Sequence, residues 1–218
     1  MTDMTKRDPD VHLAGKMLAE RRHACAFFNS REEEHRILLP FIKETVDQGE
    51  KSIFLVDRES RPERLRWLEE SGIDADALRQ RGQIEIRPWE EAYLRGGRFS
   101  QDAMLSLIDE LYATSKANGF LQTRLWASMD WALQDRPGVE DLVEYEARLN
   151  YILPKYDHIT VCVYDLAQFS ASLIMDVVRT HPLVIIGGNL QENPFYVPPD
   201  EFLRELRSRS PTSCHHGH

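Results

Sequence analysis

The feature of this chain that most constrains its fold is an alternation of short apolar runs with longer stretches that carry apolar residues at helical spacing. Residues 24–28, 53–56 and 159–164 are almost continuously apolar, a pattern typical of strands buried on both faces of a parallel sheet. Strands that alternate with helices are joined by right-handed crossovers. We therefore expect an α/β fold, a three-layer sandwich with a mostly parallel sheet and helices on both of its faces.

The first long helix has boundary signals at both ends. Ser30 and Glu33 match a capping box, which starts the helix, and Gly49 stops it. Pro40 lies inside this helix and removes one backbone amide donor, so we expect a kink there. The other predicted helices cover residues 11–20, 61–71, 101–117, 139–152, 169–179 and 199–207, and the other predicted strands cover residues 83–87, 123–129 and 184–186.

Composition limits the class of protein. With 218 residues, 42% of them hydrophobic and 29% charged, the chain fits one globular domain. We place that domain at residues 11–208, between a disordered lead-in at 1–10 and a flexible tail at 209–218. The net charge of -9 argues against a direct nucleic-acid surface, so we interpret the arginine-rich residues 58–66 as the solvated face of a helix.

Apolar runs and cysteines bear on the compartment. No run reaches transmembrane length, and the first ten residues are too polar for a signal peptide, so we expect no membrane association. The three cysteines offer no disulfide framework. A reducing cytoplasm is the natural compartment for such a chain.

The turn after the first strand departs from a nucleotide-binding loop. A phosphate loop would be rich in glycine there and would carry a Lys-Ser/Thr pair. Here Asn29 and Ser30 are followed by Arg31 and by three glutamates at 32–34. These carboxylates suit the positive end of a helix dipole but repel a triphosphate. We interpret the turn as a degenerate phosphate-binding motif that has lost its phosphate chemistry.

Two aspartates, Asp57 and Asp165, follow apolar strands at their carboxyl ends. Ligands gather at this edge of open α/β sheets. The segment that ends in Asp165 resembles the metal-holding strand of ATPases, although no phosphate cradle accompanies it. A ligand contact and a simple role at the start of the next loop both stay open for these residues.

Glu146 falls near the middle of the apolar arc of the helix predicted at 139–152. A carboxylate that faces a core needs a partner, or it takes up a proton. Arg124 and Arg98 are the candidate partners. A structural ion pair and a pocket-lining role are both compatible with the pattern.

Three loops, at residues 89–99, 129–131 and 191–196, carry aromatic side chains. One such loop alone is more often packing than a binding wall. Three of them after three different strands predict one shared, partly aromatic pocket. In the first loop, Gly96 and Gly97 can act as a hinge.

Metal and nucleophile chemistry has little support in the sequence. His23, Cys25, Cys162 and His181 converge only if their strands are adjacent, and Cys25 has the character of a small core residue. No Ser or Cys lies in a sharp glycine-flanked elbow. We therefore predict no metal, no cofactor and no enzymatic activity.

Several blocks of the sequence resemble the MEDS domain, the methanogen/methylotroph sensory domain. They include YLRGGRF at residues 93–99 and QENPFYVPP at residues 191–199. The other blocks lie at residues 23–28, 39–42, 49–51, 144–146, 162–165 and 181–182. The resemblance covers about residues 23–206, and its blocks occur in the family's order.

The resemblance implies a signal-input domain that occurs alone or attached to histidine kinases and transcription regulators. It implies sensing of small hydrocarbon derivatives such as halogenated methanes or methanol. It also implies a RecA/KaiC-like core that has lost its phosphate loop, consistent with the turn at Asn29 and Ser30. ATPase-like relatives often self-associate, so a homo-oligomer is compatible with it.

Our first hypothesis is a stand-alone sensor that binds a small organic ligand, such as an alcohol or haloalkane, and relays to a histidine kinase or transcription regulator. The expected ligand-binding residues are Asn29, Tyr93, Arg98, Trp131, Glu146, Tyr164, Asp165, His181, Asn193 and Tyr196. The alternative is a protein-docking module on a catalytically dead ATPase fold. A third hypothesis is a residual nucleotide binder.

Overall fold

The structure, a computed structural model, describes residues 11–13, 16–18, 22–156 and 158–209. Within them one seven-stranded sheet has the order β5-β4-β6-β7-β3-β8-β9. Its strands are β3 (His23–Phe28), β4 (Lys51–Val56), β5 (Ile84–Pro88), β6 (Thr123–Ser128), β7 (Ile159–Asp165), β8 (Leu183–Ile186) and β9 (Asn189–Glu192). All neighbouring pairs are parallel except β8 and β9. The mostly parallel α/β sheet predicted from the sequence is confirmed.

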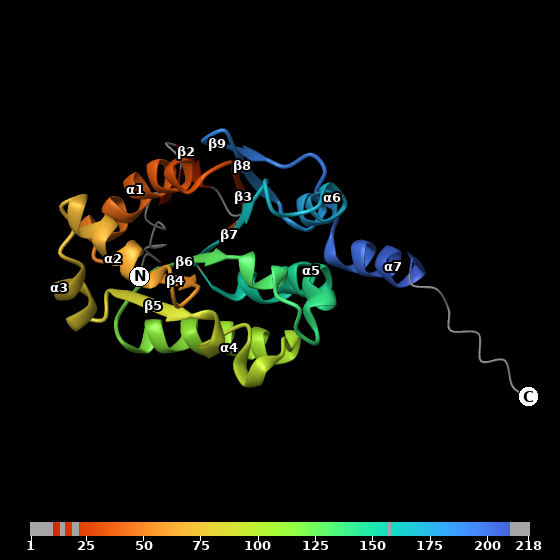
Figure 1. The fold of residues 1–218 in the computed structure, drawn as a ribbon, viewed down its shortest axis with the longest axis horizontal. Helices are drawn as coiled ribbons and strands as arrows, with labels where there is room; N and C mark the ends of the chain where they lie inside the picture. The colour runs from red at the N-terminus through yellow and green to blue at the C-terminus, as the bar shows by residue number, and fades with distance from the viewer. Residues whose placement is uncertain (1–10, 14–15, 19–21, 157, 210–218) are drawn as a thin grey trace, which may run out of the picture.

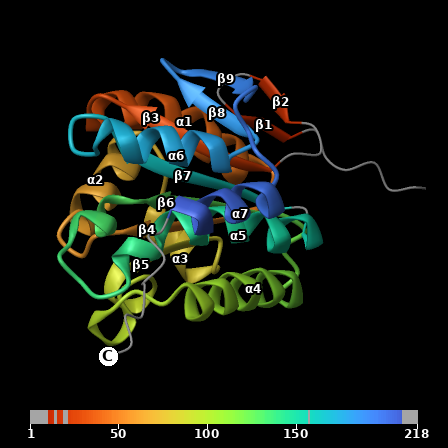
Figure 2. The same cartoon turned by 90° about the vertical axis from the view of Figure 1, so that its right-hand side faces the viewer.

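Helices cover both faces of the sheet, as Figures 1 and 2 show. On one face lie α1 (Arg31–Asp47), α2 (Arg61–Glu70) and α3 (Ala75–Gln80), and on the other lie α4 (Gln101–Ala117), α5 (Leu142–Ile152) and α6 (Ala171–Thr180). A final helix, α7 (Pro199–Arg209), packs on α5 and α6. In the described part of the chain, no helix combines the length and the apolar character needed to cross a membrane.

Strand β3 shows why the sheet is buried on both sides. Cys25 and Phe27 point into the core under α4, α5 and α6, whereas Ala24, Ala26 and Phe28 point into the core under α1, α2 and α3. Successive side chains of a strand face opposite ways, so a strand between two helical layers must be apolar throughout. The continuous apolar run in the sequence is the direct consequence.

Helix α1 begins and ends as its capping residues predict. The Ser30 hydroxyl accepts from the Glu33 backbone N–H at 3.1 Å, and the Glu33 carboxylate accepts from the Asn29 backbone N–H at 3.0 Å. The helix continues through Pro40 to Asp47. Gly49, with φ of 69°, then takes the left-handed conformation that ends it.

Several short elements differ from prediction. The helix predicted at residues 11–20 is wrong, because β1 (Val11–Leu13) pairs antiparallel with β2 (Lys16–Leu18). Helix α3 and the antiparallel strand β9 were not predicted. Strands β1, β2 and β9 lack the continuous apolar run that marks the buried strands, and α3 spans only six residues, so periodicity does not identify them. The expected lead-in at 1–10 and nearly all of the expected tail, from residue 210 on, lie outside the described residues.

Two arginines of the described residues are buried, and the burial of one of them contradicts the prediction. Arg64, in the stretch interpreted as solvated, is 3% exposed and pairs with Glu34 at 2.6 Å. Arg124 is 1% exposed, and its Nε lies 2.6 Å from Glu50 Oε2. Arg124 therefore does not pair with Glu146, so that expected partner is wrong. Each guanidinium covers an aromatic ring while its charge meets a carboxylate, which explains how a core accepts it.

Replacing Arg124 with methionine should destabilise the fold by about 3–5 kcal/mol, because the change leaves the buried Glu50 carboxylate without its partner. Urea denaturation measures the free energy of unfolding. Arg98→Met is the matched control, since Arg98 is exposed, and should stay within about 0.5 kcal/mol of the parent chain. Equal effects of the two changes would show that the Arg124 pair does not support the fold.

His158 should make stability depend on pH. Its ring is 3% exposed, and its Nδ1 accepts from the Thr123 backbone N–H at 2.9 Å. Burial, together with nearby Lys116 and Arg22, lowers the pKa of His158 from 6.5 to about 4. The folded state therefore resists protonation that the unfolded state accepts. The contribution of neutral His158 to the free energy of unfolding is therefore fully present above about pH 6.5. It is lost, by roughly 2–3 kcal/mol, as the pH drops toward 4.

The matched variant is His158→Asn, because the asparagine oxygen can accept the same N–H but does not titrate. Denaturation curves recorded between about pH 7 and pH 4 should show a smaller loss of stability in the variant. Parallel pH profiles of the two proteins would contradict this assignment.

Candidate functional site

A cleft of about 870 Å³ opens at the carboxyl edge of the sheet. Parallel strands end at the same edge, so the residues that follow them converge there. Arg31 follows β3, Asp57 follows β4, Trp89 follows β5 and Asp130 follows β6, and all four line the cleft. We call this hollow the carboxyl-edge cleft.

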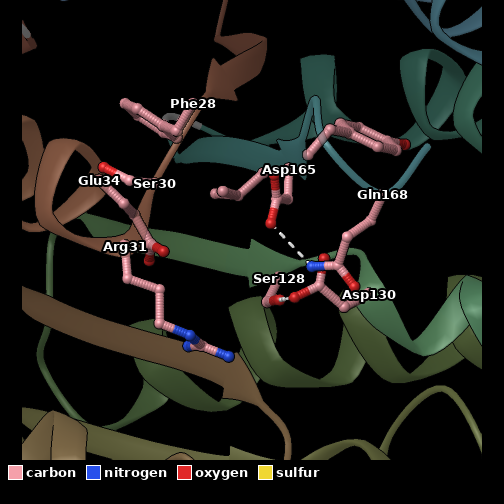
Figure 3. A pocket seen from close by; sticks show the side chains of 10 residues that line it. Phe28, Ser30, Arg31, Glu34, Ser128, Asp130, Asp165 and Gln168 are labelled. Carbon is pink, nitrogen blue, oxygen red and sulfur yellow. Dashed lines mark hydrogen bonds between the residues drawn. The ribbon is translucent and has the colours of Figure 1, made fainter. Parts of the chain in front are cut away.

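A second, much smaller pocket shares Arg31, Asp130 and Gln168 with the carboxyl-edge cleft, and most of the residues that line it are polar. Figure 3 shows Arg31 on α1 on one side, and Ser128, Asp130, Asp165 and Gln168 on the other. Gln168 Nε2 donates to Asp165 Oδ2 at 2.7 Å, and the Ser128 hydroxyl donates to Asp130 Oδ2 at 3.2 Å. Burial raises the pKa of Asp130, and the hydrogen bond from Ser128 opposes this. The carboxylates are held in place, and a ligand would meet oriented acceptors.

The connection between β3 and α1 is only two residues long, Asn29 and Ser30. That length leaves less chain than the glycine-rich loop which a Walker A motif places between strand and helix. The glutamates that follow have internal partners: Glu33 caps the helix, and Glu34 pairs with Arg64. The shortness of the turn, more than charge repulsion, distinguishes this edge from a phosphate cradle.

The structure brings the predicted aromatic residues together, but in a core. Tyr93 stacks on Trp131 with ring centroids 4.5 Å apart, and Phe99 and Tyr145 pack around them. Tyr93 and Trp131 are both buried. Trp89 is the aromatic residue from the first of these loops that lines the cleft. The Tyr93 and Trp131 rings of the predicted shared pocket are therefore packed against each other and do not line the cleft.

The other expected ligand residues are dispersed. Asn29 and Arg98 are exposed, and Tyr196 is half-buried beyond β9. Asn193 is buried, and its amide donates to the carbonyls of Val178 and His181. Asn193 thus holds the backbone at His181, and the structure does not bring these residues to one ligand.

A second polar feature lies between the sheet and α5. It consists of His23 on β3, Glu146 on α5, Cys162 on β7 and His181 just before β8, which we call the His–Glu–Cys cluster. All four residues are at most 2% exposed, and their donor atoms lie within 4.8 Å of one another. Glu146 Oε2 lies 3.5 Å from His23 Nε2, 3.4 Å from His181 Nε2 and 3.5 Å from Cys162 Sγ. The histidines, Cys162 and Tyr164, not Arg124 or Arg98, are the partners of Glu146.

Charge in this cluster is set by its neighbours. Burial alone would raise the pKa of Glu146, but His181 and His23 outweigh burial and hold that pKa well below its ordinary value. Tyr164 adds a hydrogen bond to Glu146 Oε1 at 2.6 Å. Burial lowers the pKa of His23 and raises that of the Cys162 thiol. The cluster is therefore built around a carboxylate.

The sequence analysis identified His23, Cys162 and His181 as residues that could converge, but it did not place Glu146 with them. Convergence of His23, Cys162 and His181 required adjacent strands, and β3 does lie between β7 and β8. Cys25 is excluded, because its thiol donates to the Leu183 carbonyl. In the cleft, Arg31 and Gln168 were not among the expected ligand residues. Their positions just after β3 and β7 are the signal that could have indicated them.

Comparison with known proteins first establishes the class of fold. A KaiC-like protein from the hyperthermophilic archaeon Pyrococcus horikoshii has a similar structure, with a TM-score of 0.58 over 81% of this chain and 76% of that chain. The identity between the two is 19%, so the likeness concerns the fold alone. The RecA/KaiC-like architecture is confirmed.

The family follows from the sequence match. The model of the methanogen/methylotroph, DcmR sensory domain matches residues 22–182, and this chain belongs to that family. The chain is also similar to the transcriptional repressor DcmR of Methylorubrum extorquens, at 25% identity over 180 residues. That match covers 82% of this chain and 65% of the repressor, slightly less than two thirds of its length. Both matches support a sensory or regulatory role.

Removal of the Tyr164 hydroxyl tests whether Glu146 is charged. Tyr164→Phe removes a hydrogen bond to a buried carboxylate and should cost about 1.5–3 kcal/mol of unfolding free energy. Tyr112→Phe is the matched control, because Tyr112 is equally buried but bonds to the neutral Thr160 hydroxyl, so about 0.5–1.5 kcal/mol is expected. Chemical denaturation of both variants gives the comparison, and a smaller loss for Tyr164→Phe would argue for a protonated Glu146.

Proposed function

We propose that this chain is a signal-input domain that binds a small organic molecule in the carboxyl-edge cleft and relays its presence to a histidine kinase or transcription regulator. One observation carries the proposal. At the edge where open α/β sheets bind ligands, a cleft of about 870 Å³ takes the place of a phosphate loop. Membership of a sensory family agrees with it.

The lining of the cleft indicates the chemistry of the ligand. Arg31 and Arg58 present cations, and Asp57 and Asp130 present carboxylates. Such a surface offers oriented hydrogen bonds and charged partners beside apolar contacts from Trp89, Leu94 and Leu133. Among small hydrocarbon derivatives it therefore favours molecules with a hydroxyl or carboxylate group over haloalkanes.

A route for the signal runs through the loop after β5. This loop contains the short turns η1 (Trp89–Glu91) and η2 (Arg95–Gly97), and it lines the cleft through Trp89, Leu94 and the glycine pair. Gly96 and Gly97 both have positive φ, at 74° and 79°, so they hold a conformation that other residues rarely adopt. A ligand that binds one arrangement of this loop better than another would shift its population and change the surface offered to a partner.

We infer a non-enzymatic role for the same site. The two-residue turn between β3 and α1 does not supply the backbone amides that cradle a triphosphate. Asp165, at the position that would hold a metal in an ATPase, is already bonded to Gln168 and to the Ala167 backbone N–H. These contacts support a receptor more than a residual nucleotide binder.

A thermal-shift screen tests the proposed function. We expect a small alcohol or carboxylate at about millimolar concentration to raise the melting temperature, because a ligand that binds only the folded state stabilises it. Arg31→Ala should abolish the shift, since Arg31 lines the cleft. Arg36→Ala is the matched control, because Arg36 lies on the same helix, is exposed and is not part of the lining.

The same screen includes ATP with magnesium. A shift with ATP that Arg31→Ala removes would favour the nucleotide-binding hypothesis. If no small organic compound stabilises the parent chain, or if Arg31→Ala and Arg36→Ala respond alike, the cleft is not the sensory site.

A further inference from the structure

We propose that His23, Glu146, Cys162 and His181 bind one divalent transition-metal ion, zinc foremost, between the sheet and α5. The four residues come from four segments of the chain that the fold brings together. They lie on the face of the sheet that α4, α5 and α6 cover, and none of them lines the carboxyl-edge cleft. The proposal is independent of the proposed function.

His23 is held in one orientation by Asn150. Asn150 Nδ2 donates to the carbonyls of Thr180, Glu146 and Ala147, at 2.8, 3.2 and 3.3 Å. That fixes the amide, so Asn150 Oδ1 is the atom that faces His23 Nδ1 at 3.1 Å. An oxygen accepts, so Nδ1 carries the proton. The lone pair of His23 is then on Nε2, which points into the cluster.

His181 is oriented in the same way. Its Nδ1 lies 2.8 Å from the Val177 carbonyl oxygen, which can only accept, so this nitrogen also carries the proton. Its Nε2 is fully buried and has no hydrogen-bond partner within the described residues. Metal-binding histidines commonly donate one ring N–H to a carbonyl or amide oxygen and leave the other nitrogen for the ion.

The two lone pairs face a carboxylate. Both Nε2 atoms lie 3.4–3.5 Å from Glu146 Oε2, and all three atoms are acceptors in this arrangement. Acceptors held together in a buried site repel one another unless a shared proton or a metal cation lies among them. A cation at the centre would turn this repulsion into coordination.

The spacing of the donor atoms suits a tetrahedral ion. Bonds of about 2.0 Å to nitrogen or oxygen and about 2.3 Å to sulfur place neighbouring donors roughly 3.3–3.5 Å apart. Glu146 Oε2 is 3.4–3.5 Å from the other three donors, Cys162 Sγ is 3.7 Å from His23 Nε2, and the remaining pairs lie within 4.8 Å. Small side-chain adjustments would close the set around one ion.

The donor types indicate the metal. One thiolate and one carboxylate balance the charge of a divalent cation, and the two imidazoles are neutral, so the loaded site carries no net charge into the core. Binding requires only that the Cys162 thiol releases its proton. Thiolate with imidazole and carboxylate is a zinc donor set, and burial on all sides makes the site closed rather than catalytic.

The surrounding residues strengthen the assignment. Tyr164 donates to Glu146 Oε1, the carboxylate oxygen that faces away from the histidines, and leaves Oε2 for the ion. Asn193 donates to the backbone carbonyl of His181. An ion here would join β3, β7, α5 and the segment before β8, strands and helix that lie together in the molecule (Figure 1). It would stabilise the folded core beneath the cleft.

Metal content is the first measurement. The C-terminal residues Cys214, His215, His216 and His218 could also take up metal, so the parent chain for this experiment carries Cys214→Ser, His215→Asn, His216→Asn and His218→Asn. After purification and incubation with zinc, it should retain one zinc ion per chain through dialysis, measured by elemental mass spectrometry. A chelator should lower its melting temperature.

A matched pair of cysteine variants locates the site. Cys162→Ser removes a proposed donor, whereas Cys25→Ser changes the cysteine paired with it in register on β3, whose thiol donates to a carbonyl instead. Cobalt added to the parent chain and to Cys25→Ser should produce a thiolate charge-transfer band and intense visible bands. Cys162→Ser should lack the charge-transfer band and bind zinc at least tenfold more weakly.

A second variant keeps the test decisive if Cys162→Ser does not fold. Asn150→Ala leaves all four donors in place but removes the amide that orients His23, and it should weaken zinc binding by about 10–100-fold. The proposal is overturned if the folded parent chain takes up no zinc at micromolar free concentration. It is equally overturned if zinc uptake is the same in the parent chain, Cys162→Ser and Asn150→Ala, in which case the cluster is a hydrogen-bonded network that shares a proton.

Discussion

The parallel pairing of β3 with β7 on one side and β8 on the other is the constraint on which the rest of this structure depends. Backbone hydrogen bonds set the register, and register decides which side chains share a face. The pairing places His23 and Cys162 on neighbouring strands and brings His181 in front of β8. It also sends the carboxyl ends of β3 and β7 to the same edge as β4, β5 and β6, where the cleft forms. Both polar features follow from one arrangement of strands.

The fold accepts charge in its interior by pairing every buried ion with a specific partner. Arg64 on α2 meets Glu34 on α1, and Arg124 on β6 meets Glu50 just before β4, each at 2.6 Å. Removal of a charge from water costs several kcal/mol, which only close partners and further hydrogen bonds offset. Glu146 is different, because its partners are imidazoles whose second nitrogens are already committed to Asn150 and the Val177 carbonyl. Arg64–Glu34 and Arg124–Glu50 are therefore structural ion pairs, whereas the His–Glu–Cys cluster is a set of possible metal donors that face one centre.

Prediction from the sequence succeeded where a signal repeats over many residues. Helix α4 has the predicted bounds, Gln101–Ala117, because four turns of apolar stripe leave little ambiguity. Strands β3, β4 and β7 were found because burial on both faces requires continuous apolar runs. Prediction failed for β1, β2 and β9, which are short and have no continuous apolar run, and for α3, which spans only six residues. It also failed for Arg64, which lies in a charged stretch but reaches the core through its partner Glu34.

The sequence alone was enough to predict that ligands would bind at the carboxyl edge of the sheet and which types of residue follow the strands there. The apolar runs that end in Asp57 and Asp165, and the short turn without glycines at Asn29 and Ser30, were enough to indicate a ligand edge without a phosphate loop. The helical spacing of the apolar residues around Glu146 showed that this carboxylate faces a core. Only the tertiary structure decided which groups meet there. Arg124 pairs with Glu50 and not with Glu146. Tyr93 and Trp131 stack on each other. His23 on β3 and His181 before β8 contact Glu146 although they are distant from it in the sequence. The physical reason is that periodicity records how each element faces its surroundings, whereas the partner of a buried charge depends on which strands lie side by side.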